Sequence, residues 1–145
     1  MPSVFDVAAY ILKKQGSMTA MKLQKLVYYS QAWSLVWDEK PLFDEEIQAW
    51  ANGPVVPDLY DAHRGSFTVA HENFGRGKWS VLDEDERETV DAVLRTYGPM
   101  SAHELSELTH REKPWKSARK GLKAGQRGCR MIPIERMHEY CIGPA

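Results

Sequence analysis

The residue types that most often do chemistry are sparse in this chain of 145 residues, and they follow no catalytic or metal-binding spacing. Cys129 and Cys141 are too few for a disulfide framework, and their spacing matches no zinc motif. None of the five histidines belongs to a His-Glu-x-x-His pair. His103 and His110 would share one face of a continuous helix, but we expect Thr109 to begin a new element and so to separate them. We predict no metal site and no cofactor.

Signatures of catalysis are also missing. The sequence contains no Gly-x-Ser-x-Gly nucleophile elbow, no phosphate-binding loop and no paired Cys and His context. The consecutive acids Asp44, Glu45 and Glu46 would point to alternating faces of a strand, and therefore would not converge on one cation. We predict that the protein is not an enzyme.

Composition indicates one globular domain that covers residues 1–145. Hydrophobic residues make up 43% of the chain and charged residues 27%, which is ordinary for a globular protein. No apolar run approaches the roughly 20 residues that cross a bilayer. Residues 1–6 lack the basic region and apolar core of a secretory signal. We expect a cytoplasmic protein with no membrane partner.

The net charge of −1 conceals a strong segregation of charge. Acids gather between residues 38 and 61 and again between 83 and 91. Basic residues gather between 111 and 136, namely Arg111, Lys113, Lys116, Arg119, Lys120, Lys123, Arg127, Arg130 and Arg136. This segregation indicates either internal pairing of the two kinds of segment or the attraction of a charged partner.

Hydrophobic periodicity predicts a mainly α-helical fold with a minor β part. We expect about six helices around a buried central helix at about 19–37, which contains neither Gly nor Pro and has Thr19 as its N-cap. A small β element is expected near 46–50 and 130–132, and a loop at 64–80. The other helices are expected over 4–14, 57–63, 84–97, 101–108, 115–119 and 133–140.

The central helix is apolar on much of its circumference, so it should be buried on two or more sides. Gln24, Tyr28 and Gln31 lie on or near a shared stripe of it. Polar groups on a buried helix need partners, and we expect the neighbouring loops to supply them. Gly53, which precedes a proline, is expected to form a tight turn.

Three clusters follow one another along the chain. The first is Lys22-Leu23-Gln24-Lys25-Leu26 with Tyr28-Tyr29, the second Gly53-Pro54-Val55, and the third Leu108-Thr109-His110 with Pro114-Trp115. In this order they resemble the SocA-like, or Panacea-domain, antitoxins of bacteria and their phages, over most of the chain from about residue 19. The resemblance implies an antitoxin that is encoded beside a protein toxin and neutralises it by direct binding. It also allows a role as an adaptor that presents the toxin to a protease.

The resemblance, together with the aromatic residues next to chain breaks, predicts a toxin-binding surface. Aromatic side chains are enriched at the energetic centres of interfaces. The predicted surface consists of Gln24, Tyr28, Gln31, Trp50, Gly53, Pro54, Val55, His110, Pro114 and Trp115.

A DNA-binding regulator, which represses its own operon, is the alternative function. Residues 101–108 and 115–120 resemble a helix-turn-helix in length and polarity. The nucleic-acid contacts would then come from Lys116, Arg119, Lys120, Lys123 and Arg127. Pro114 argues against this function because it stands where the reading helix would begin. Many antitoxins also repress their own operon, so the two functions are compatible.

Overall fold

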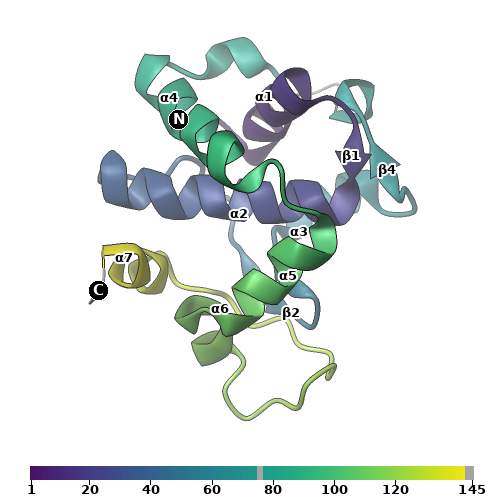
Figure 1. Ribbon diagram of the computed structural model, residues 1–145, viewed down its shortest axis with the longest axis vertical. Helices are drawn as coiled ribbons and strands as arrows, with labels where there is room; N and C mark the ends of the chain where they lie inside the picture. The colour runs from purple at the N-terminus through teal and green to yellow at the C-terminus, as the bar shows by residue number, and fades with distance from the viewer. Residues whose placement is uncertain (75–76, 143–145) are drawn as a thin grey trace.

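The computed structural model describes residues 1–74 and 77–142, and it confirms a mainly α-helical fold with a minor β part (Figure 1). The helices are α1 (Val4–Gln15), α2 (Ala20–Trp37), α3 (Pro57–His63), α4 (Glu84–Tyr97), α5 (Ala102–Arg111), α6 (Lys113–Ala118) and α7 (Ile134–Ile142). The short elements are the strands β1 (Met18–Thr19), β2 (Gln48–Trp50), β3 (Gly53–Val55) and β4 (Thr68–Val69) and the 3-10 helices η1 (His71–Phe74) and η2 (Trp79–Val81).

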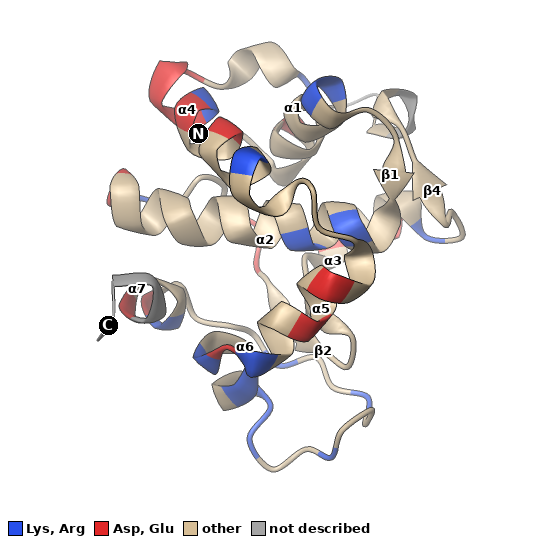
Figure 2. Ribbon diagram, in the orientation of Figure 1, with Lys and Arg blue, Asp and Glu red and all other residues tan. Residues whose placement is uncertain are grey.

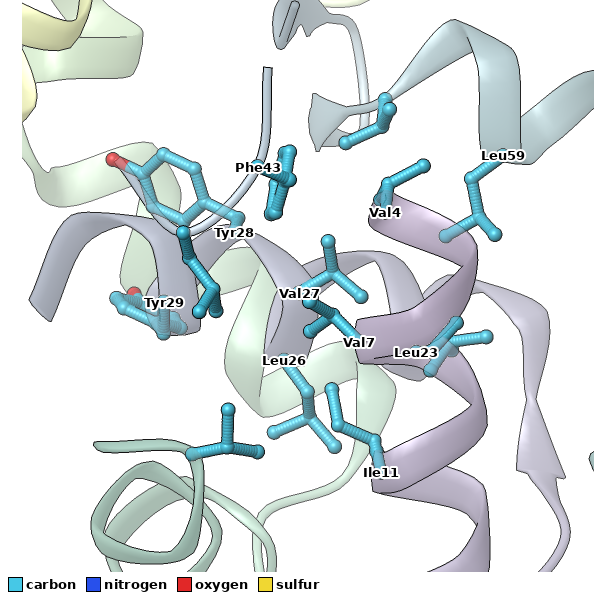
Figure 3. Packing of buried hydrophobic residues seen from close by; sticks show 14 of the residues in the cluster. Val4, Val7, Ile11, Leu23, Leu26, Val27, Tyr28, Tyr29, Phe43 and Leu59 are labelled. Carbon is cyan, nitrogen blue, oxygen red and sulfur yellow. The ribbon is translucent and has the colours of Figure 1, made fainter. Parts of the chain in front are cut away.

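Helix α2 lies in the middle of the molecule. In Figure 1 it crosses the view horizontally, with α1 and α4 above it and β2, α5, α6 and α7 below it. Every residue from Leu23 to Ala32 is buried, as the apolar circumference of this segment predicts. Leu23, Leu26 and Val27 pack against the apolar face of α1 in a single core (Figure 3).

The helix starts follow local capping signals, which is why the sequence predicts them well. Ser3, Asp83 and Ser101 each form a complete capping box, in which the cap side chain accepts from the backbone three residues on and the reciprocal acid accepts from the cap. Thr19 caps α2, its hydroxyl accepting from the Lys22 amide at 3.2 Å.

The glutamines of α2 hold the loops around it, which confirms the expectation for polar groups on a buried helix. The Gln31 carbonyl accepts from the Leu42 amide at 2.6 Å, and its amide donates to the Phe43 carbonyl at 2.9 Å. The Gln24 carbonyl accepts from the Val56 amide at 2.9 Å, and its amide donates to Val56 O at 3.3 Å and to His63 Nε2 at 3.0 Å. The chain before β2 and after β3 is therefore fixed by α2.

The predicted β element is confirmed and is larger than expected. Segment 130–132 lies along β2, with a bridge from Gln48 to Met131 and backbone hydrogen bonds from Ala49 N to Arg130 O at 2.8 Å and from Ile132 N to Ile47 O at 2.7 Å. Strand β2 also pairs antiparallel with β3, so Gly53, Pro54 and Val55 form a strand of a hairpin and not only a turn. The hairpin carries Pro54 because the missing amide of proline is tolerated in a ladder of only two strands.

Two segments predicted as breaks are more ordered than expected. Apart from residues 75 and 76, which lie outside the described residues, the segment 64–80 is not a plain loop, because β4 pairs with β1 and the two 3-10 helices follow. The expectation that Thr109 begins a new element is wrong, since α5 continues to Arg111 and Glu112 is the N-cap of α6. No helix in the described ranges is both long and apolar enough to cross a membrane.

Replacing Gln31 tests how far the fold depends on these buried amide contacts. We expect Gln31→Leu to lower the free energy of unfolding by about 2–4 kcal/mol, because it leaves buried backbone groups of Leu42 and Phe43 without partners. The same change at the exposed Gln15, whose amide makes one contact of 3.3 Å with Gly98 O, should cost about 0.5 kcal/mol or less. Urea denaturation measures both variants, and equal losses would contradict the assignment.

Candidate partner-binding site

The three sequence clusters meet at the tip of the β2–β3 hairpin. The Trp115 indole on α6 donates to the Trp50 carbonyl at 2.8 Å, and the Ser106 hydroxyl on α5 donates to the Asn52 carbonyl at 2.6 Å. The His110 ring stacks on Trp115 with centroids 4.1 Å apart. Helices α5 and α6 therefore hold the hairpin by its backbone, and the side chains of the tip remain available to a partner.

Gly53 lies directly against Lys25 of α2. Its φ of +124° is one that residues with a side chain rarely adopt. A Cβ at this position would also lie 2.5 Å from Lys25 Cε and 3.1 Å from Thr109 Oγ1. The close backbone approach that a glycine permits is thus used by a lysine of the same chain.

Lys25 is completely buried, and its ammonium nitrogen has no hydrogen-bond partner among the described residues. Burial alone lowers the pKa of Lys25 from 10.5 to about 7. The pKa values of His63 and His110 are also lowered. Desolvation is the largest cause for both, and the positive charge of Lys25 is a smaller cause in the same direction. Nε2 of His110 is also buried without a partner.

A second buried contact fixes the turn between α5 and α6. The Tyr29 hydroxyl donates to Glu112 Oε1 at 2.9 Å, and the Tyr29 ring stacks on Tyr97 with centroids 4.0 Å apart. Burial raises the pKa of Glu112 to about 7, and the bond from Tyr29 opposes that rise. Because Glu112 is the N-cap of α6, this contact orients the helix that carries Trp115.

The structure separates the predicted surface residues into two groups. Those that are buried are Gln24, Tyr28, Gln31, Gly53, Pro54, Val55 and Pro114. Trp50, His110 and Trp115 are partly exposed, and the neighbouring Asn52 is exposed. The three α2 residues are buried: Gln24 holds Val56 after the hairpin and Gln31 holds Leu42 and Phe43 before it, and a direct contact of these residues with a partner stays a prediction. We call Trp50, Asn52, His110 and Trp115 the hairpin face.

Arg119, predicted as a DNA contact, is instead a structural residue. It is 5% exposed, and its guanidinium donates to Ala49 O at 3.0 Å and to Gln126 O at 2.5 Å. It also lies over the Trp115 ring, 5.2 Å from the centroid. The other predicted contacts (Lys116, Lys120, Lys123 and Arg127) are exposed, but α6 is only six residues long and begins next to Pro114.

The acidic and basic segments do not pair with each other. In the part of the chain that the structure describes, the single ion pair is His103 with Glu107, at 3.9 Å within α5. Figure 2 shows the basic residues on α6 and on the segment that follows it, away from the acids of α4. No described group of His, Cys, Asp or Glu is arranged to hold a metal ion.

Sequence reasoning missed the residues that organise the site from within, above all Lys25, Tyr29 and Glu112. For Lys25 a signal exists, because a lysine inside a helix that is apolar on most of its circumference must be buried or must reach a special partner. Asn52 has no such signal, because its exposure follows from the way the hairpin is held.

Changing Lys25 should reveal the cost of burying its amine. Between pH 7 and 10.5 the unfolded chain binds a proton that the folded protein has lost, so stability rises with pH across this window. We expect Lys25→Met to be more stable than the parent at pH 7, by up to about 4 kcal/mol at ~1.4 kcal/mol per pKa unit. The difference should shrink towards pH 10, as measured by urea denaturation at several pH values. Lys40→Met at an exposed site serves as control, and a difference for Lys25→Met that is constant with pH would refute the burial of a shifted amine.

Comparison with known proteins identifies a matching family. Residues 23–116 match the family model described as "Antitoxin SocA-like, Panacea domain". The chain is 30% identical over 124 residues to Antitoxin SocA of Caulobacter vibrioides (strain NA1000 / CB15N), covering 75% of this chain and 66% of that relative. No solved structure matches the chain significantly. The matched region contains the three clusters that meet at the hairpin, except for Lys22 at the start of the first, and the chain belongs to the SocA-like, Panacea-domain family of antitoxins.

Proposed function

We propose that this antitoxin neutralises a protein toxin, encoded nearby, by binding it directly through the hairpin face. The observation that carries the proposal is the convergence of the three family clusters on one exposed hairpin tip. Lys25 lies beneath that tip, α5 binds its Asn52 carbonyl and α6 binds its Trp50 carbonyl. A rigidly held tip with partly exposed aromatic rings is the kind of surface that binds a protein with little loss of conformational entropy.

The charge around the hairpin face supports a partner with an acidic surface. Lys113 and Lys116 on α6 are exposed and have no acidic partner among the described residues. Unpaired charges of one sign attract an oppositely charged partner and accelerate association. On this proposal the antitoxin acts in the cytoplasm, by covering the active site or the substrate path of the toxin.

Delivery of the bound toxin to a protease is compatible with the same contact, because an adaptor must first bind its cargo. Autorepression through DNA has weaker support. Its predicted reading helix is the six-residue α6, and the central cation of its predicted contacts, Arg119, is bound to backbone carbonyls.

Removing the Trp50 side chain tests the hairpin face. The neighbouring gene is expressed alone and together with this protein, and growth is compared. We expect co-expression of the unchanged antitoxin to restore growth and Trp50→Ala to restore it poorly, with the affinity of the purified pair reduced at least tenfold by titration calorimetry. The variant keeps the contact of the Trp50 carbonyl with Trp115. It loses the hydrogen bond from the Trp50 indole to the side chain of Gln48.

Trp37→Ala is the matched control, since it removes an indole that is 50% exposed at the far end of α2. It should restore growth fully. Full rescue by Trp50→Ala with loss in Trp37→Ala would place the contact elsewhere, and rescue without any binding of the purified proteins would refute direct neutralisation. Binding of operator DNA with sequence preference would support the alternative.

A further inference from the structure

We propose that the groove between the β2–β3 hairpin and the basic segment 119–130 binds an extended acidic segment of the partner protein, with one bulky apolar side chain of that segment seated on Trp50 and Tyr60. The inference rests on the proposed function in one respect, namely that this partner is the toxin. It extends the hairpin face, with which the groove shares Trp50 and Asn52, and it defines the chemistry of the segment that is recognised.

The groove has the size and lining of a peptide-binding site. Its volume is about 660 Å³, within the usual range for ligand sites. Met21, Trp50, Val55 and Tyr60 give it an apolar lining. The Trp50 and Tyr60 rings meet edge to face with centroids 4.9 Å apart, which leaves a fixed aromatic surface for an apolar side chain.

The opposite wall of the groove is held in place although it forms no regular secondary structure. The buried Arg119 donates to the carbonyls of Lys123 and Gln126 on this segment and to Ala49 on the hairpin. Arg130 donates to Lys120 O, which ties the end of the segment to its beginning. The groove is therefore already formed and does not have to be created by the partner.

The basic residues along the groove indicate that an acidic peptide segment binds there. Arg127 lines the groove, Lys120 and Lys123 are exposed on the same segment, and no acid pairs with them in the described part of the chain. The nearby acids of α3, Asp58 and Asp61, are exposed but do not line the groove. An apolar side chain with acidic neighbours satisfies both the aromatic wall and the basic wall.

A peptide assay tests the groove without the toxin. The probe is the blocked peptide Asp-Glu-Phe-Glu-Asp, and its comparisons are Lys-Arg-Phe-Arg-Lys and Asp-Glu-Gly-Glu-Asp. Cys129, exposed and lining the groove, reports occupancy through its rate of alkylation by iodoacetamide, in a Cys141→Ser background that leaves one thiol. We expect the acidic Phe peptide to slow alkylation at least threefold at saturation, and both comparison peptides to bind at least fivefold more weakly by titration calorimetry.

Two variants, with one control, separate the effect of the groove's charge from the effect of its shape. Arg127→Glu should weaken binding of the acidic Phe peptide at least fivefold, whereas Arg136→Glu, the same change at an exposed position of α7 outside the groove, should leave it within twofold. Ala51→Phe puts a ring into the groove without changing charge and should remove the advantage of Phe over Gly in the probe.

Equal binding of the acidic and basic peptides, or no protection of Cys129 at millimolar peptide, would overturn the proposal. The outcomes are separate from those for the proposed function. Peptide binding without rescue of growth leaves the groove in place and removes direct neutralisation. Rescue of growth without peptide binding overturns the groove proposal and leaves direct neutralisation in place.

Discussion

Every residue of α2 from Leu23 to Ala32 is buried, so each polar side chain in this stretch must find its partner inside the protein. Gln24 and Gln31 meet this requirement by bonding backbone groups of chain segments that have no regular structure of their own. The dependence is mutual. Without these segments the glutamines would be buried without hydrogen-bond partners. Without the glutamines, the buried backbone groups of Leu42 and Val56 would lack partners. The position of the β2–β3 hairpin follows, because these contacts fix the chain before β2 and after β3.

What the sequence predicts correctly is determined by contacts close in the chain. The capping boxes of α1, α4 and α5 span three residues each, and the buried central helix follows from apolar residues on most of its circumference. What it predicts wrongly depends on distant segments. The pairing of Gly53 to Val55 with β2 requires that α2, α5 and α6 hold the hairpin. Thr109 has the local chemistry of an N-cap, yet its hydroxyl donates within α5 to Ser106 O at 2.8 Å, and the helix continues past it.

The same distinction explains why the site was predicted only in part. The clusters that carry the family resemblance are mostly buried: Gln24 and Tyr28 lie inside the protein, and Gly53 accommodates Lys25. They determine where the hairpin face is. Residues proposed to touch a partner, such as Asn52 and Lys116, lie next to these clusters in the chain, and their side chains are exposed, so replacing them should leave the fold intact.

Lys25 shows that this scaffold is not optimised for stability alone. A methionine would fill the same space with no charge to desolvate, whereas the lysine has a pKa of about 7 and is therefore partly protonated, with no partner, near neutral pH. Buried ionisable groups with strongly shifted pKa values are concentrated at the functional sites of proteins. Here the amine lies against Gly53, the one residue of the hairpin that has no side chain to separate its backbone from α2. Lys25 therefore lies between the buried core of α2 and the hairpin that carries the hairpin face.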